Sequence, residues 1–171
     1  SPLGNGDSYA LASIVRYEFP SRENLPPVTL TWYDGGMRPM QLPELEEGMK
    51  MGPGGTLYIG DKGKILDNKI LPASLRNSYK TPEPYIQSSP GHEEEWIEAC
   101  KGGKPAGSDF EWAGPLTETV LLGNIAIHNE LKETLSGKLL KFYPEKFCFQ
   151  DMPEADKFLH TPYREGWNLT M

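Results

Sequence analysis

The chain has 171 residues, of which 37% are hydrophobic and 11% aromatic, and its net charge is −7. This size and composition suit one globular domain with a core, and the acidic balance argues against a nucleic-acid or membrane-surface partner, since both need a concentrated basic face. The two cysteines, Cys100 and Cys148, have neither the spacing of a zinc site nor that of a disulfide framework, so we expect two buried free thiols and no metal site.

The first part of the chain has the alternating pattern of β-strands. Residues 11–19 alternate until Pro20, and a second alternating run begins at Val28. The link between the runs is too short for a helical crossover, so we expect them to pair antiparallel. The second run closes in Trp32-Tyr33-Asp34-Gly35-Gly36, where a strand presents two aromatic rings and then a carboxylate at a turn. The residues expected on one face are Ser13, Val15, Tyr17 and Phe19 in the first run and Val28, Leu30 and Trp32 in the second.

The middle of the chain is rich in turn-forming residues. Residues 37–55 predict a long loop, because glycine, proline and glutamate dominate there. Two short runs, 56–60 and 64–66, predict a hairpin around Asp61-Lys62-Gly63. Residues 71–88 contain three prolines and predict an extended, irregular segment.

Helix signals begin at Ser89, which is placed to cap a helix whose first residue is Pro90. Glutamates at 93–95 complement the positive end of this helix, and Gly102-Gly103 is expected to end it. A second, largely apolar helix is predicted to start at Pro115 and to lie in the core.

The last part of the chain predicts two short strands, at 138–143 and 146–150, and a short final helix. Asp151 and Glu154 have the spacing of a capping box for that helix, and the tail follows from Thr161. Strands followed by helices, without regular alternation, indicate an α+β fold. We expect an open, mostly antiparallel sheet with helices packed on one face.

Few residues suggest chemistry. His92 stands at the start of the first helix, where a neutral imidazole could donate to a substrate hydroxyl; a surface or capping role is the simpler interpretation. His128 fits a dipole partner at a helix C-terminus, and His160 an ordering role in the tail. No two histidines have ligand spacing. The glycine-rich 52–55 follows no predicted strand, so it does not predict a phosphate-binding loop.

The tail carries two aromatic residues and an arginine in Tyr163-Arg164-Glu165-Gly166-Trp167. Such a segment commonly docks on its own domain, with the arginine bonding carbonyls or a carboxylate and the tryptophan filling a groove. Alternatively, it lines a polar ligand cleft. The residues that we select as candidates for positioning a substrate, through hydrogen bonds and stacking, are Trp32, Asp34, His92, Tyr163 and Arg164.

Together these segments resemble the C-terminal domain of Gfo/Idh/MocA-type oxidoreductases, in the bacterial branch with an extended C-terminal domain. The resemblance runs from about Ser13 to the tail, and its five parts occur in the family's order. The segments that carry it are 28–36, 58–63, 96–100, 114–118 with 121–124, and 163–167.

The resemblance implies that residues 1–171 are the single C-terminal domain of a two-domain parent. An N-terminal Rossmann domain, absent from this chain, would bind NAD or NADP, and the C-terminal sheet would help to form the substrate cleft and a homo-oligomer interface. The substrate would be a sugar, inositol or related polyol, and the parent would be cytoplasmic or periplasmic.

The family's dinucleotide fingerprint, its Glu-Lys-Pro lysine and its catalytic histidine have no counterpart in this chain. Glu145-Lys146-Phe147 comes near the lysine motif but lacks the proline. We therefore assign no catalytic or cofactor-binding residue and expect the chain alone to be inactive.

Two other classes of function remain open. A carbohydrate-binding module would use exposed aromatic rings as stacking platforms, and a structural or dimerisation domain would use the sheet mainly as an interface. The rings available for stacking are those of Trp32, Tyr33, Trp96, Trp112 and Trp167.

Overall fold

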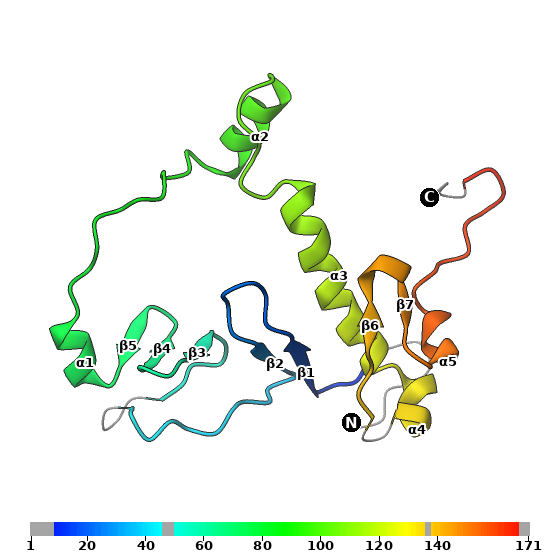
Figure 1. Cartoon of the computed structure of the whole chain (residues 1–171), viewed down its shortest axis with the longest axis horizontal. Coiled ribbons are helices and arrows are strands. Elements are labelled where there is room, and N and C mark those ends of the chain that lie inside the picture. Colours follow the sequence, from blue (N-terminus) through cyan, green and yellow to red (C-terminus); the bar gives the residue numbers. More distant parts are fainter. Residues whose placement is uncertain (1–8, 46–49, 136–137, 168–171) are drawn as a thin grey trace. The chain divides into compact units, whose positions relative to one another are not determined.

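The structure is a computed structural model that describes residues 9–45, 50–135 and 138–167 (Figure 1). It confirms the α+β class, since helices occur together with antiparallel strands. The described strands form three small open sheets of two, three and two strands in place of one larger sheet. The chain divides into two compact units. We call Ser1–Met37 with Ser108–Met171 the discontinuous unit, and Arg38–Gly107 the inserted unit.

The discontinuous unit begins with the predicted hairpin. Strand β1 (Ser13–Phe19) pairs antiparallel with β2 (Val28–Asp34) along its whole length, which confirms the predicted pairing. Directly opposed residues in an antiparallel pair share a face of the sheet. The predicted faces therefore match across the two strands, and the opposed pairs are Ser13 with Asp34, Val15 with Trp32, Tyr17 with Leu30, and Phe19 with Val28.

The longest helix is α3 (Phe110–Ala126), and it starts one turn earlier than predicted. Asp109 caps it, because its Oδ1 accepts a hydrogen bond of 3.1 Å from the backbone N–H of Trp112. Pro115 consequently lies inside the helix, where the sequence predicted the start. As the sixth residue of the helix, Pro115 lies past the unpaired first turn, so it removes the hydrogen bond that an N–H at this position would donate to the Glu111 carbonyl.

A small core follows α3. The elements around it are η1 (Asn129–Leu131), α4 (Lys132–Leu135), β6 (Phe142–Tyr143), η2 (Pro144–Lys146), β7 (Cys148–Phe149) and α5 (Pro153–Asp156). Five buried side chains form its centre, and they belong to Ile125, Leu131, Leu135, Phe149 and Ala155. The two late strands are confirmed at shorter length.

The capping box predicted at Asp151 and Glu154 is wrong. Met152 occupies the cap position of α5, and no side chain caps the helix. Instead, Asp156 Oδ1 accepts a hydrogen bond of 2.6 Å from the backbone N–H of Phe149, which attaches the end of α5 to β7. A charged acceptor makes this one of the stronger hydrogen bonds of the core.

The inserted unit holds a three-stranded antiparallel sheet in the order β3 (Leu57–Ile59), β4 (Lys64–Leu66), β5 (Lys69–Leu71). The predicted hairpin between the first two strands is confirmed. The helix α1 (Ala73–Ser78) lies where an extended, irregular segment was predicted. Six residues are too few for a helical period to show in the sequence.

Helix α2 (His92–Cys100) also differs at its start. Gly91 is its cap residue and has a φ of 130°. Ser89, the predicted cap, instead accepts a hydrogen bond of 3.1 Å from the Gly91 backbone N–H. Gly102 follows the helix with a φ of 82°, as expected for a glycine that ends a helix. Both cysteines are free, but Cys100 is exposed and Cys148 only half-buried, so their predicted burial is wrong.

Candidate functional site

The face of the hairpin that carries Tyr17 contacts α3 at Gly123. A Cβ atom built on Gly123 would overlap Tyr17 Oη and would lie 3.5 Å from Val15 Cγ1. Only glycine allows this approach, because any other residue places a carbon where the tyrosine hydroxyl lies. The contact fixes which face of the hairpin meets the helix.

Tyr17 is half-buried at this contact, and its phenol is held in the neutral form. Burial raises the pKa of Tyr17, and a hydrogen bond with the Gly123 backbone opposes that rise. The Tyr17 ring stacks on the Phe19 ring with centroids 6.3 Å apart. One face of the hairpin therefore packs on α3 at Tyr17.

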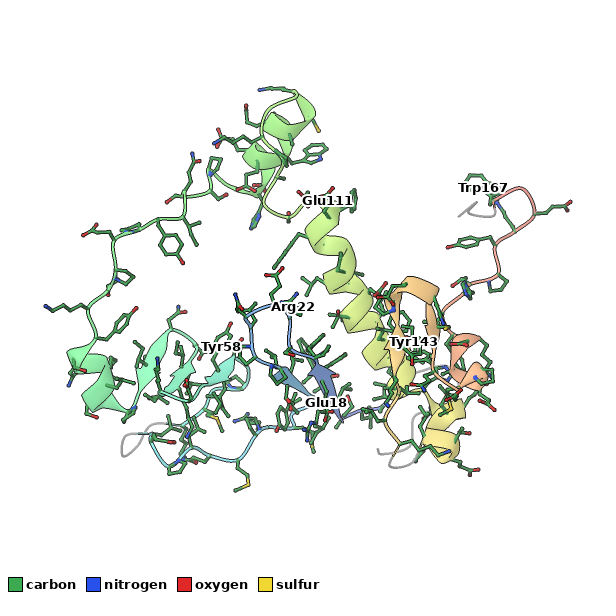
Figure 2. The ribbon with its side chains drawn as sticks, in the orientation of Figure 1. Glu18, Arg22, Tyr58, Glu111, Tyr143 and Trp167 are labelled. Carbon is green, nitrogen blue, oxygen red and sulfur yellow. The ribbon has the colours of Figure 1, made fainter. Side chains whose placement is uncertain are left out.

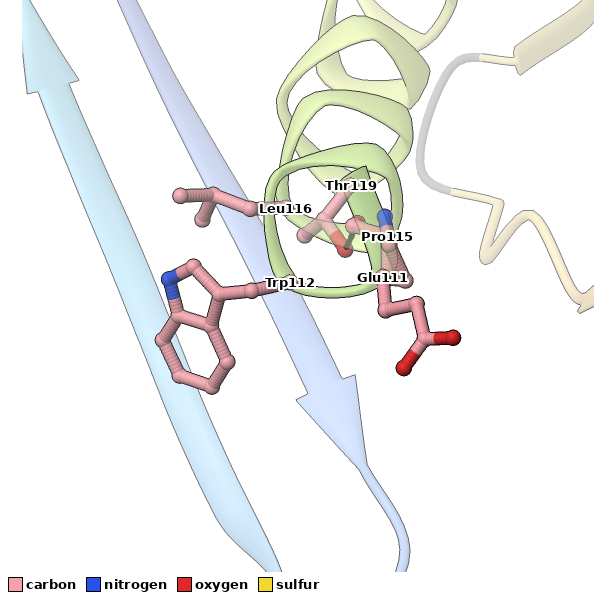
Figure 3. Close-up of a pocket in the computed structure, with 5 residues that line it drawn as sticks. All are labelled: Glu111, Trp112, Pro115, Leu116 and Thr119. Carbon is pink, nitrogen blue, oxygen red and sulfur yellow. Dashed lines mark hydrogen bonds between the residues drawn. The ribbon is translucent and has the colours of Figure 1, made fainter. Parts of the chain in front are cut away.

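The helix stripe that contains Gly123 continues toward the N-terminus of α3 as exposed apolar side chains. Val120, Leu116 and Trp112 follow at spacings of three and four residues, which places them on the same face of a helix. Figure 3 shows Trp112 and Leu116 projecting from the same side of α3, with Glu111 directed away from them. The helix therefore buries this stripe near its end and leaves it exposed near its start.

The hairpin contributes three more exposed apolar side chains on the face that meets α3. We call the six together the apolar surface: Val28, Leu30, Trp32, Trp112, Leu116 and Val120. Each is between 42% and 68% exposed. At full areas of about 250 Å² for a tryptophan and about 120 Å² for an aliphatic side chain, they expose on the order of 500 Å². The largest exposed apolar patch of an ordinary monomer covers about 300–600 Å² and is often functional, so this surface is a candidate interaction site.

A shallow hollow lies beside this surface at the start of α3. Its volume is about 310 Å³, and its lining residues are Glu111, Trp112, Pro115, Leu116 and Thr119 (Figure 3). The Thr119 hydroxyl donates to the Pro115 carbonyl at 2.9 Å, so that hydroxyl is already engaged. Glu111 supplies the only charge of this lining. The hollow therefore suits an apolar side chain of a partner better than a small polar ligand.

Asp34 and Trp32 lie two positions apart on the same face of β2, and both are exposed. The turn after Asp34 closes through a hydrogen bond of 3.3 Å from the Met37 N–H to the Asp34 carbonyl. Gly35 has a φ of 64°, and a Cβ there would overlap the Leu11 carbonyl oxygen. Glycine is thus required where this turn packs on the preceding segment, which fixes the backbone at the end of β2 next to Asp34.

The other predicted candidates lie elsewhere in the chain. Tyr163 and Arg164 belong to the segment after α5, where the Arg164 guanidinium stacks on the Trp167 ring at 4.1 Å. Trp167 is exposed, so it does not fill a groove in the described part of the chain (Figure 2). Within residues 9–45 and 138–167, no hydrogen bond or ion pair joins Tyr163 or Arg164 to β2.

His92 is exposed at the first position of α2, in the inserted unit. The five candidates are therefore divided between the two units: Trp32 and Asp34 share a face of β2, Tyr163 and Arg164 are consecutive in the tail, and His92 lies in the inserted unit. Their joint role as a substrate site stays a prediction.

His128 and His160 have structural contacts. His128 Nδ1 accepts a hydrogen bond of 3.3 Å from the Glu130 N–H, and its ring packs on Phe158 at 4.1 Å. The expected dipole role of His128 is therefore wrong; it caps η1 instead. The His160 ring meets Phe147 edge-on at 5.6 Å.

The glycine-rich segment 52–55 does not form the turn of a dinucleotide site. A dinucleotide site needs a strand, a glycine-rich turn and a helix in succession. The glycine-rich segment 52–55 instead leads into strand β3. Over the residues that the structure describes, no three His, Cys, Asp or Glu side chains gather as a metal site. Nor is any helix of the described segments long and apolar enough to cross a membrane.

Comparisons with known proteins add no relative. No family model matches the chain, and no curated protein matches it. In the part of the chain that the structure describes, the apolar surface is a candidate site defined by the packing of α3 on the hairpin. Sequence reasoning did not identify it, although the spacing of Leu116 and Val120 signals the helix stripe. The approach of Gly123 to Tyr17 depends on residues more than 100 positions apart and has no local signal.

Proposed function

We propose that the chain is the C-terminal domain of an NAD(P)-dependent, Gfo/Idh/MocA-like oxidoreductase that acts on a sugar, inositol or related polyol. The observation that carries this proposal is the apolar surface, which runs along β2 to Asp34 within one of the five segments that carry the resemblance. A sheet face that is apolar and ends in an exposed carboxylate suits a domain that packs on another protein surface and borders a polar cleft.

In the proposed cleft, Trp32 and Asp34 would position the substrate. An indole face stacks on the C–H face of a sugar ring, and a carboxylate accepts hydrogen bonds from hydroxyl groups. The remaining candidates, His92, Tyr163 and Arg164, would add donors from other segments. None of these residues transfers hydride, so the chemistry belongs to the proposed Rossmann domain and its bound NAD or NADP.

Calorimetric titration of the chain with NAD⁺, NADH, NADP⁺ and NADPH tests the division of roles. We expect no binding, because the described residues do not form a strand–glycine turn–helix site. Micromolar binding of any of the four would contradict the two-domain proposal.

The gene that encodes the chain gives a second, independent test. We expect the sequence upstream of residue 1 to encode G-x-G-x-x-G after a strand, then Glu-Lys-Pro and an Asp-x-x-x-His helix. An upstream reading frame without these three motifs would refute the family assignment.

A carbohydrate-binding module is favoured by one specific observation, the exposure of Trp32 and Trp112 on one surface. A glycan array distinguishes it from the proposed domain, since a module binds sugar without a partner domain. Binding that is lost in Trp32→Ala and retained in Trp96→Ala, on the inserted unit, would support the module. We expect the chain alone to bind no glycan.

A further inference from the structure

Residues 80–90 connect α1 to α2, and they contain no helix or strand. Figure 1 draws this connection as a long coil between the two helices. All of its residues are exposed, and Tyr85 and Ile86 are 87% and 76% exposed. No backbone–backbone hydrogen bond of the described chain involves the connection. An enzyme that binds an extended chain therefore has no backbone pairing to break before it binds here.

The prolines of the connection leave only one of its edges with a full set of donors. In an extended chain, the N–H and C=O groups of alternate residues lie on the same edge. Glu83, Tyr85 and Gln87 keep their N–H groups on one edge. Pro82 and Pro84 remove two donors from the other edge, and they restrict the residues before them to extended conformations. The connection can therefore pair as a strand along the edge that contains Tyr85.

We propose that the connection is a processing site, cleaved between Tyr85 and Ile86 by an endopeptidase that binds an aromatic side chain. Such an enzyme binds its substrate as an added strand, and an apolar pocket takes the side chain before the cleaved bond. The exposed Tyr85 ring fits that pocket, and its N–H lies on the edge that keeps its donors. In the reaction, the C–N bond between the two residues breaks. Water supplies a hydroxyl to the Tyr85 carbonyl carbon and a proton to the Ile86 nitrogen.

Two other exposed tyrosines are less suited to such an enzyme. The Tyr79 N–H donates to the Arg76 carbonyl at 3.2 Å, so the donor that strand pairing needs is already engaged. Tyr163 also follows a proline, but the chain turns directly after it. There the Arg164 carbonyl accepts a hydrogen bond of 3.0 Å from the Trp167 N–H, and this turn must open before the segment can extend.

The proposed cut divides the chain between its folded elements. The sheet β3–β5 and α1 lie before it. Helix α2 lies after it, with the hydrogen bond of 2.9 Å that Glu95 Oε2 accepts from the Gly107 N–H. The hairpin β1–β2 and α3 would belong to different fragments, so the contact of Tyr17 with Gly123 would join two chains. Processing would therefore divide the apolar surface between two separable fragments.

Limited proteolysis of the full, folded chain with chymotrypsin tests the position of the cut, and mass spectrometry identifies the first products. We expect fragments 1–85 and 86–171 to appear first. Cuts after Tyr79 and Tyr163 should each be at least about 10-fold slower, because each needs a backbone hydrogen bond to open. Trypsin tests the edge. A cut after Lys80 would use the edge on which Pro82 has no N–H, so trypsin should cut Tyr85→Lys after position 85 at least about 10-fold faster than after Lys80.

Two proline variants form a matched pair for the mode of binding. Gln87→Pro removes an N–H from the pairing edge, and Ser88→Pro removes one from the edge that already lacks two. We expect Gln87→Pro to slow chymotrypsin cleavage about 10-fold, and Ser88→Pro to leave the rate within about 2-fold. Equal rates for the two variants, or a first cut outside residues 80–90, would overturn the proposal. It concerns the inserted unit alone, so its outcome does not depend on the proposed function.

Discussion

The contact between Gly123 and Tyr17 makes a quantitative prediction about α3. In an exposed helix interior, Gly→Ala stabilises by about 1 kcal/mol, because alanine loses less backbone entropy. At Gly123 the added carbon would overlap Tyr17 Oη, and the tyrosine must move. Overpacking of this kind costs about 1–3 kcal/mol. We therefore expect Gly123→Ala to destabilise the discontinuous unit by about 1 kcal/mol net.

Tyr17→Phe isolates the cause. Without the hydroxyl, the nearest atom to the new carbon is Tyr17 Cζ at 3.1 Å, which needs a shift of only a few tenths of an ångström. Gly123→Ala should then be neutral or stabilising, giving a coupling free energy of about 1–2 kcal/mol between the two sites. The double-mutant cycle subtracts the stability that Tyr17→Phe loses with its own hydrogen bond, so only the coupling between the two sites remains.

Gly114 provides the matched control in the same helix. A Cβ there has no atom within 4 Å apart from its chain neighbours, but a Cβ before Pro115 is disfavoured in a helix, so Gly114→Ala should stabilise by less than about 1 kcal/mol. Hydrogen exchange of the α3 amides is the suitable readout, because it reports the opening of this unit by itself. If Gly123→Ala stabilised α3 as much as Gly114→Ala, the reasoning from the close approach would be refuted.

Three further predictions concern the turn, the core and pH. Gly35→Ala should cost about 2–4 kcal/mol, from positive φ and overlap with a carbonyl oxygen, and Gly36→Ala only about 1 kcal/mol; equal urea midpoints would contradict this. Leu131→Ala should cost about 2–5 kcal/mol in urea unfolding, because Leu131 is almost fully buried; a loss below 1 kcal/mol would disprove its core role. Lys157, 2.6 Å from Glu130, holds the pKa of Glu130 below its ordinary value of 4.5. The stability that this pair contributes is present above pH 4.5 and is lost as pH falls through the lower folded pKa, so Lys157→Gln should flatten the acid side of the stability profile; an unchanged profile would exclude the pair.

The sequence predicted those elements that depend on local pattern. Strict alternation identified β1 and β2, and the short link between them gave their pairing. The start of α3 was misplaced because a proline typically opens a helix, whereas Asp109, the actual cap, lies six residues before Pro115. The capping box at Asp151 failed because α5 begins one residue later than the box requires: Met152 is the cap residue, and Asp151 before it has a φ of 53°.

The candidate site shows the limit of local reasoning more clearly. Trp32 and Asp34 share a face because strands have a period of two, so their proximity could be predicted. Tyr163, Arg164 and His92 are separated from them by long stretches of chain with no periodic relation to β2. Nothing in residues 15–17 indicates that a glycine in a helix will pack on them. The apolar surface therefore became visible only when the approach at Gly123 placed the helix stripe on the sheet.

The division of the discontinuous unit by the inserted unit has a consequence for chain entropy. The contact of Tyr17 with Gly123 closes a loop that contains all of residues 38–107. Closing a loop costs about (3/2)RT ln n, so a tenfold shorter connection between Met37 and Ser108, which would leave the closed loop at about two fifths of its length, would lower that cost by only about 0.8 kcal/mol. The same logarithm means that lengthening the insertion costs little, since each doubling adds only about 0.6 kcal/mol. Residues 38–107 can therefore change in length with little effect on the closure of the hairpin against α3.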